Sequence, residues 1–143
     1  DTIGTTAKSN ALLAAEVKVV TGFQEVFDAQ GKLYFGFVKQ VTPAVTLAIT
    51  FEPAPTAQAE KDAWRAGTAR QIQLKTVGSA LTSPGTYTLR TQKINLAGKW
   101  EKFEKIDEQN GNDVIKATFR ARYNSNAALF ATFIEVSDQV SLA

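Results

Sequence analysis

The sequence predicts an all-β protein with one flanking helix, folded as an antiparallel β-sandwich or barrel. Three observations predict this class. Apolar and polar residues alternate along most of the chain, turn-forming clusters separate the alternating runs, and only one segment has helical character. The chain of 143 residues suits a single domain, and 44% hydrophobic residues against 21% charged residues can form a core.

The first half of the chain contains patterns for four strands. Residues 1–10 are small and polar, which predicts a linker or flexible segment before a single β-sandwich domain over 11–143. Alternation over 13–20 predicts a half-buried strand. Residues 23–38 predict a hairpin whose turn lies at 28–31. The apolar residues at 45, 47, 49 and 51 predict one buried face of a fourth strand.

The one helical segment covers residues 56–66, which are rich in helix-forming residues. Thr56 is predicted as its N-cap and Gly67 as its C-terminal stop. Trp64 is the only large apolar residue in this segment. We therefore expect Trp64 to hold a short helix against the sheet.

The remaining strand patterns lie at 70–76, 87–96, 100–106, 114–123 and 129–136. Residues 78–85 predict a loop, because they contain a Ser-Pro-Gly turn sequence. The apolar phase shifts within 87–96, which predicts a bulge near 91–93. Gly98 is expected to separate two strands, and Asn110-Gly111 predicts a type I′ turn between two others.

The chain contains no His, no Cys and no Met. The absence of His excludes Ser-His-Asp catalysis, and the absence of Cys excludes thiolate chemistry and Cys-rich zinc sites. Without Met, we expect a processed chain or a domain of a longer one. No apolar run approaches the roughly 20 residues of a membrane-spanning helix, and a net charge of +2 does not indicate an anionic partner. No cofactor, metal or membrane partner is therefore predicted.

The clustered charges between residues 101 and 113 allow two chemical interpretations. Glu104 and Asp107 are the best pair of carboxylates for a glycosidase, and residues 107–113 carry enough oxygen atoms for a calcium loop. Alternating lysines favour a solvated hairpin end instead, and the glycine does not fall at the EF-hand position. We therefore predict no catalytic residues.

Four residues are candidates for an interface or a channel lining. Lys116, Arg120 and Arg122 share one face of a strand, which can contact phosphates or, as we favour, pair with acidic residues of a neighbouring strand or subunit. Trp100 lies among charged residues and is predicted to be a semi-exposed interface anchor.

Most aromatic residues follow strand periodicity and are assigned to the core. These are Phe23, Phe27, Phe35, Phe37, Phe51, Phe119, Phe130 and Phe133. A sugar-binding platform of Tyr34, Trp64, Trp100 and Phe103 is the alternative use of aromatic residues.

The order of elements resembles that of the tail tube proteins, or major tail proteins, of long-tailed bacteriophages. The resemblance covers roughly residues 11–140 and is carried by KINLAGKW at 93–100, QNGNDV at 109–114, ATFRARY at 117–123 and EKDAWRAG at 60–67. It is a likeness of order and style, since this family has no short diagnostic motif.

The resemblance implies a β-sandwich whose sheets join edge to edge with those of neighbouring copies. Such copies form hexameric or pseudo-hexameric rings that stack into a tube in the phage virion. The tube contacts other tail proteins and conducts DNA by transient, non-specific contact. The family's long ring-locking loop is not evident, because residues 78–85 are short for it. The alternative function is a carbohydrate- or protein-binding module such as an adhesin or capsid-decoration domain.

Overall fold

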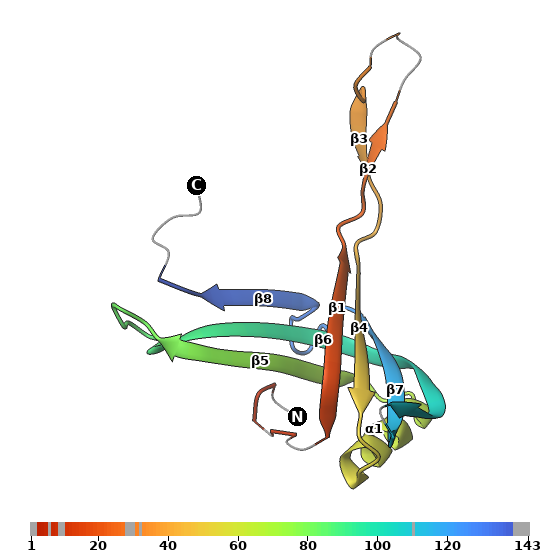
Figure 1. The fold of residues 1–143 in the computed structure, drawn as a ribbon. Helices are drawn as coiled ribbons and strands as arrows, with labels where there is room; N and C mark the ends of the chain where they lie inside the picture. The colour runs from red at the N-terminus through yellow and green to blue at the C-terminus, as the bar shows by residue number, and fades with distance from the viewer. Residues whose placement is uncertain are drawn as a thin grey trace.

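The structure is a computed structural model that describes residues 3–5, 7–8, 11–27, 31, 33–109 and 111–138 (Figure 1). It contains one helix and eight strands among these residues. They are β1 (Leu12–Val20), β2 (Phe23–Val26), β3 (Phe37–Gln40), β4 (Ala44–Phe51), α1 (Pro55–Arg65), β5 (Arg70–Ala80), β6 (Leu89–Gln109), β7 (Asn112–Ala121) and β8 (Ala131–Val136).

Six strands form one antiparallel sheet in the order β1-β4-β7-β6-β5, with β8 also paired to β6. The sheet curls into a half-barrel, so that β1 and β4 run steeply across the direction of β5, β6 and β8 (Figure 1). The predicted class, antiparallel all-β with a single helix, is confirmed. All the strand pairs among the described residues are antiparallel, as the short turns between the strand patterns predicted.

Strand β6 joins the two parts of this sheet because it is 21 residues long. Its first half pairs with β5 on one side and β8 on the other, and its second half pairs with β7. Gly98 was expected to end a strand, and that prediction is wrong. It lies inside β6, opposite both Arg70 and Ala121, where a residue without Cβ permits close approach of β7.

Three other features differ from the sequence-based expectation: the end of one strand, the position of a register shift and the start of the helix. Strand β5 continues to Ala80, so only the later part of the predicted loop at 78–85 lacks strand structure. The predicted bulge at 91–93 is instead a register shift on β5, between Val77 and Ala80. Helix α1 begins at Pro55 with Ala54 as an N-cap that makes no side-chain hydrogen bond, so Thr56 is not the cap. Proline suits the first helical position because it needs no hydrogen-bond acceptor there.

The hydrophobic core lies in the concave part of the half-barrel, between β4, β6, β7 and α1. Strand β4 buries its alternate apolar residues as predicted, and Phe119 of β7 is fully buried. Helix α1 closes the core with Ala57 and Ala63, and the Trp64 ring packs against that of Phe103 with the ring centroids 5.6 Å apart. The expected role of Trp64 in holding the helix against the sheet is therefore confirmed.

Strands β2 and β3 form a separate two-stranded hairpin, which continues from β1 and β4 and projects far beyond the main sheet (Figure 1). The predicted pairing is confirmed, from Phe23 opposite Gln40 to Val26 opposite Phe37. Residues 33–35 lie outside the strands. Residues 28–30 of the predicted turn, and Asn110 of the Asn-Gly turn, lie outside the described residues.

Candidate assembly surfaces

The basic face of β7 is largely neutralised by the strand beside it. The Lys116 Nζ lies 2.6 Å from an Asp107 carboxylate oxygen, and Arg120 Nη1 lies 3.4 Å from a Glu101 carboxylate oxygen. Both acidic residues belong to β6, so the favoured interpretation, cross-strand pairing, is confirmed. Arg122 follows the end of β7 and is exposed; within the described part of the chain it forms no ion pair.

The Asp107–Lys116 pair keeps both groups charged. The Lys116 ammonium and the backbone N–H of Glu108 donate to Asp107 and lower the pKa of its carboxyl, and the same pairing raises the pKa of Lys116. Lys102 likewise donates to Glu104 and lowers its pKa. A general acid needs a raised pKa, so Glu104 and Asp107 are poorly suited to the glycosidase role that the sequence allowed. The described residues contain no group of three or more acidic side chains that could hold a metal ion.

Trp100 is buried, with 6% of its surface exposed, so the prediction of a semi-exposed interface anchor is wrong. A register shift between Trp100 and Lys102 reverses the alternation of β6, and both Trp100 and Phe103 therefore face the core. The indole N–H donates to a carboxylate oxygen of Glu60 at 2.9 Å, and the Arg70 guanidinium lies 3.2 Å from the same oxygen. Trp100 thus ties the sheet to α1.

The aromatic platform predicted as an alternative does not form. Trp100 and Phe103 are buried, the Trp64 ring packs on Phe103, and Tyr34 lies on the projecting hairpin. Because these four side chains lie in different places, they offer no common surface to a sugar.

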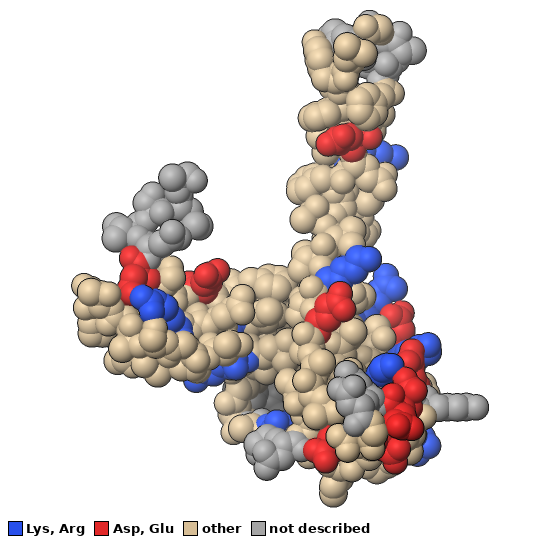
Figure 2. All heavy atoms as spheres, in the orientation of Figure 1, with Lys and Arg blue, Asp and Glu red and all other residues tan. Residues whose placement is uncertain are grey.

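The projecting hairpin, here called the arm (residues 21–42), exposes much of its apolar surface. Its exposed large apolar residues are Phe23, Phe27, Leu33, Tyr34, Phe35, Phe37, Val38 and Val41. The core assignment of Phe23, Phe27, Phe35 and Phe37 is therefore wrong, and Phe133 of β8 is also half exposed. Figure 2 shows an arm with few charged side chains. Apolar surface of this extent usually marks a contact with another molecule.

The base of the arm has a defined geometry. Gly22 is buried with a φ of +79°, and an added Cβ would lie 2.1 Å from the carbonyl oxygen of Val41. The Val41 N–H in turn donates to the Gly22 carbonyl oxygen at 2.7 Å. Glycine is required here for two reasons. Other residues disfavour a positive φ, and their Cβ would clash with the backbone at Val41, where the arm returns to the sheet. The arm therefore leaves the sheet in a set direction.

Strand β1 forms one margin of the half-barrel. Within the described residues it pairs only with β4, so its outer backbone groups have no partner strand. Leu13 and Val19 of β1 are both about half exposed. An exposed edge strand with apolar side chains favours pairing with another chain. The sequence predicted the strand, but its position at an edge is a property of the tertiary structure.

At the opposite end of the molecule, Asp138 connects the end of β8 to the segment between β5 and β6. Its carboxylate accepts hydrogen bonds from the Thr82 backbone N–H at 2.8 Å and from the Thr82 hydroxyl at 3.2 Å, and it pairs with the Arg90 guanidinium. The hydrogen bond from the Thr82 N–H lowers the pKa of the Asp138 carboxyl, and Arg90 lowers it further. Partial desolvation opposes these effects but does not outweigh them.

We expect Asp138 to make stability depend on pH in acid. Because its folded pKa is lowered, its contribution is present above the unfolded pKa of about 4 and is lost as the pH falls through the folded pKa. Asp138→Asn should therefore reduce stability at pH 7 and converge with the wild type below the folded pKa. Urea unfolding between pH 2 and 7 measures this effect. Parallel profiles for the two proteins would contradict it.

The features that stand out in the described residues are thus the curled sheet, its unpaired margin strand β1 and the exposed apolar arm. No model of a known protein family matches this sequence, and no curated protein matches it. Among the described residues, no helix has the length and apolar character needed to cross a membrane.

Proposed function

We propose that this protein is a structural protein of a bacteriophage tail, which associates with copies of itself into rings that stack as a DNA-conducting tube. The observation that carries the proposal is the unclosed half-barrel, whose margin strand β1 pairs on only one side within the described residues. A neighbouring sheet that pairs with β1 would extend the curvature and cover the exposed edge.

The arm is the second feature that supports the proposed tube. The sequence resemblance implied a long loop that locks successive rings, and residues 78–85 were too short for it. The arm lies elsewhere in the chain, extends well beyond the sheet and carries exposed aromatic residues such as Phe23 and Phe37 (Figures 1 and 2). Burying this surface on the next ring is a strong hydrophobic driving force.

The charge distribution is also compatible with a conduit. DNA slides only where its phosphates are held weakly, because each lysine or arginine that neutralises a phosphate strengthens binding. Two of the three cations predicted to form a basic strip, Lys116 and Arg120, are already paired with carboxylates. The alternative function, a carbohydrate- or protein-binding module, was motivated by exposed aromatic residues, Trp100 especially, and Trp100 is buried.

The proposal predicts a different assembly defect for each surface. Leu13→Lys/Val19→Lys should prevent ring formation, because lysine on an edge strand opposes pairing. Phe23→Ser/Phe37→Ser should leave rings but prevent their stacking, because it removes apolar surface from the arm alone. Sedimentation velocity and negative-stain microscopy at high protein concentration distinguish monomers, rings and tubes.

Tyr123→Ser serves as the control, because Tyr123 is 67% exposed but lies outside both surfaces. Far-UV circular dichroism establishes that each variant is folded. A wild-type chain that remains strictly monomeric at every concentration would overturn the proposed function.

A further inference from the structure

Two like-charged pairs lie far apart on the long strand β6. Lys75 of β5 is directly opposite Lys93 of β6. Toward the other end, Glu108 of β6 is directly opposite Asp113 of β7. Like charges at directly opposed positions destabilise a sheet. Neither pair therefore stabilises the isolated molecule.

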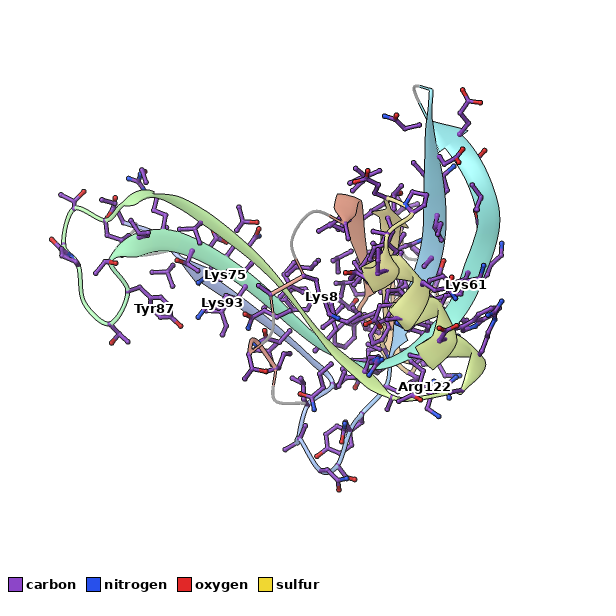
Figure 3. The ribbon with its side chains drawn as sticks, turned by 90° about the horizontal axis from the view of Figure 1, so that it is seen from below. Lys8, Lys61, Lys75, Tyr87, Lys93 and Arg122 are labelled. Carbon is purple, nitrogen blue, oxygen red and sulfur yellow. The ribbon has the colours of Figure 1, made fainter. Side chains whose placement is uncertain are left out.

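Neither like-charged pair forms an ion pair with another side chain that the structure describes, and the side chain of Lys105 is not among these. None of the ion pairs there involves Lys75, Lys93, Glu108 or Asp113. The Lys93 ammonium instead lies 4.8 Å from the centre of the Tyr87 ring, and its Nζ is 3.5 Å from the Tyr87 hydroxyl. This contact orients Lys93 but leaves its charge uncompensated. Figure 3 shows Lys75, Tyr87 and Lys93 together on the part of the sheet formed by β5 and β6.

The basic pair borders an open hollow of about 180 Å³, whose lining includes Val77, Tyr87 and Leu89 as well as both lysines. Val77 lies two residues from Lys75 on the same side of β5, and 47% of its surface is exposed. At the acidic end, Ile106 lies two residues from Glu108 on the same side of β6, with 60% exposed. Each surface thus combines a charged pair with an exposed aliphatic side chain.

We propose that the acidic β6–β7 hairpin end of one molecule docks into the basic hollow of a second copy, with Glu108 and Asp113 facing Lys75 and Lys93. Charge complementarity selects this occupant, because the chain itself carries the matching acidic pair on a narrow hairpin end. The two surfaces are different and lie at opposite ends of β6 (Figure 1). Such a contact is heterologous and continues from copy to copy, as a ring or filament requires. The inference rests on the proposed self-assembly and names one contact that directs it.

A charge-exchange experiment tests this contact in the full chain. Lys75→Glu/Lys93→Glu makes both surfaces acidic, and Glu108→Lys/Asp113→Lys makes both basic. Each variant alone should associate at least about tenfold more weakly than the wild type, because like charges then face each other. An equimolar mixture should recover association, since every contact between unlike variants pairs opposite charges. The variant with all four substitutions should also associate with itself.

Sedimentation velocity at 50 mM and at about 500 mM NaCl provides the measurement, and the higher salt concentration should weaken wild-type association by screening. The Lys61→Glu/Lys99→Glu variant matches the charge change at exposed or half-exposed lysines outside the hollow, and it should associate as the wild type does. Circular dichroism checks that all variants are folded.

The outcomes separate this inference from the proposed function. If the wild type assembles and neither charge reversal nor mixing changes its association, the contact is wrong while the proposed function stands. If the hollow binds a DNA oligonucleotide that the Lys75→Glu/Lys93→Glu variant no longer binds, and self-association is unchanged, a polyanion is the occupant and the contact is again wrong. A wild type that never associates overturns both.

Discussion

Gly98→Ala is expected to lower the free energy of unfolding by about 3 kcal/mol, although it adds only one methyl group. The added Cβ would lie 2.1 Å from the carbonyl oxygen of Arg120 and 2.9 Å from the Cα of Ala121. Both atoms belong to the backbone of β7, so no side-chain rotation can relieve the contact. The strands must separate where Gly98 pairs with Ala121 and where the Arg122 N–H donates to the Ala97 carbonyl oxygen at 2.8 Å.

Gly85→Ala is the matched control for this substitution. An added Cβ at Gly85 meets no atom within 4 Å, and its φ is not in the positive range. Its effect should stay within about 0.5 kcal/mol of zero. Urea unfolding followed by tryptophan fluorescence measures both variants. Equal stability of Gly98→Ala and Gly85→Ala would show that β7 does not approach β6 as closely as described.

Trp100→Ala is expected to lower the free energy of unfolding by about 3–5 kcal/mol, the usual cost of removing a large buried aromatic side chain. The Trp100 ring contacts those of Phe51, Phe103 and Phe119, with centroids 5.1–5.9 Å apart. Its loss leaves a cavity among these rings. It also removes a donor from the Glu60 carboxylate, which the Arg70 guanidinium then holds alone.

Two further variants divide this effect into its parts. Trp100→Phe keeps an aromatic ring but loses the indole N–H, so it should cost about 1–2 kcal/mol, close to the value of one charge-assisted hydrogen bond. Tyr123→Ala removes an exposed aromatic residue and should change stability little. Far-UV circular dichroism is the appropriate probe, because Trp100→Ala removes one of two tryptophans. A near-neutral Trp100→Ala would mean that the residue is exposed, as the sequence first indicated.

The Trp100 effect arises beside a register shift in β6 and the Gly98 effect at a close backbone approach to β7, and sequence periodicity describes neither feature. Alternation correctly predicted the buried face of β4, since that strand is regular. Around Trp100 the strand is irregular, because a register shift turns Trp100 and Phe103 of β6 toward the core. The charged neighbours Glu101 and Lys102 then suggested exposure for a side chain that is buried.

The arm shows the same limit in another form. Its alternating aromatic residues predicted strands, and the β2–β3 pairing is present. Periodicity cannot distinguish a face that packs on the protein's own core from one left open to another molecule. Phe23 and Phe37 were therefore assigned to the core but lie exposed on a projecting hairpin. Whether these side chains are buried or exposed depends on the direction of the hairpin. Gly22 and its backbone hydrogen bond with Val41 set that direction.

By itself, the sequence determined the antiparallel all-β class and the single helix held by Trp64, because both follow from local periodicity, and it favoured the cross-strand pairing of Lys116 and Arg120 without excluding other partners. Only the tertiary structure decided that β1 is a margin, that the arm is free of the core, and that the acidic and basic pairs lie far apart on β6. These features depend on contacts between segments distant in the chain, and such contacts leave no periodic signal in the residues that make them.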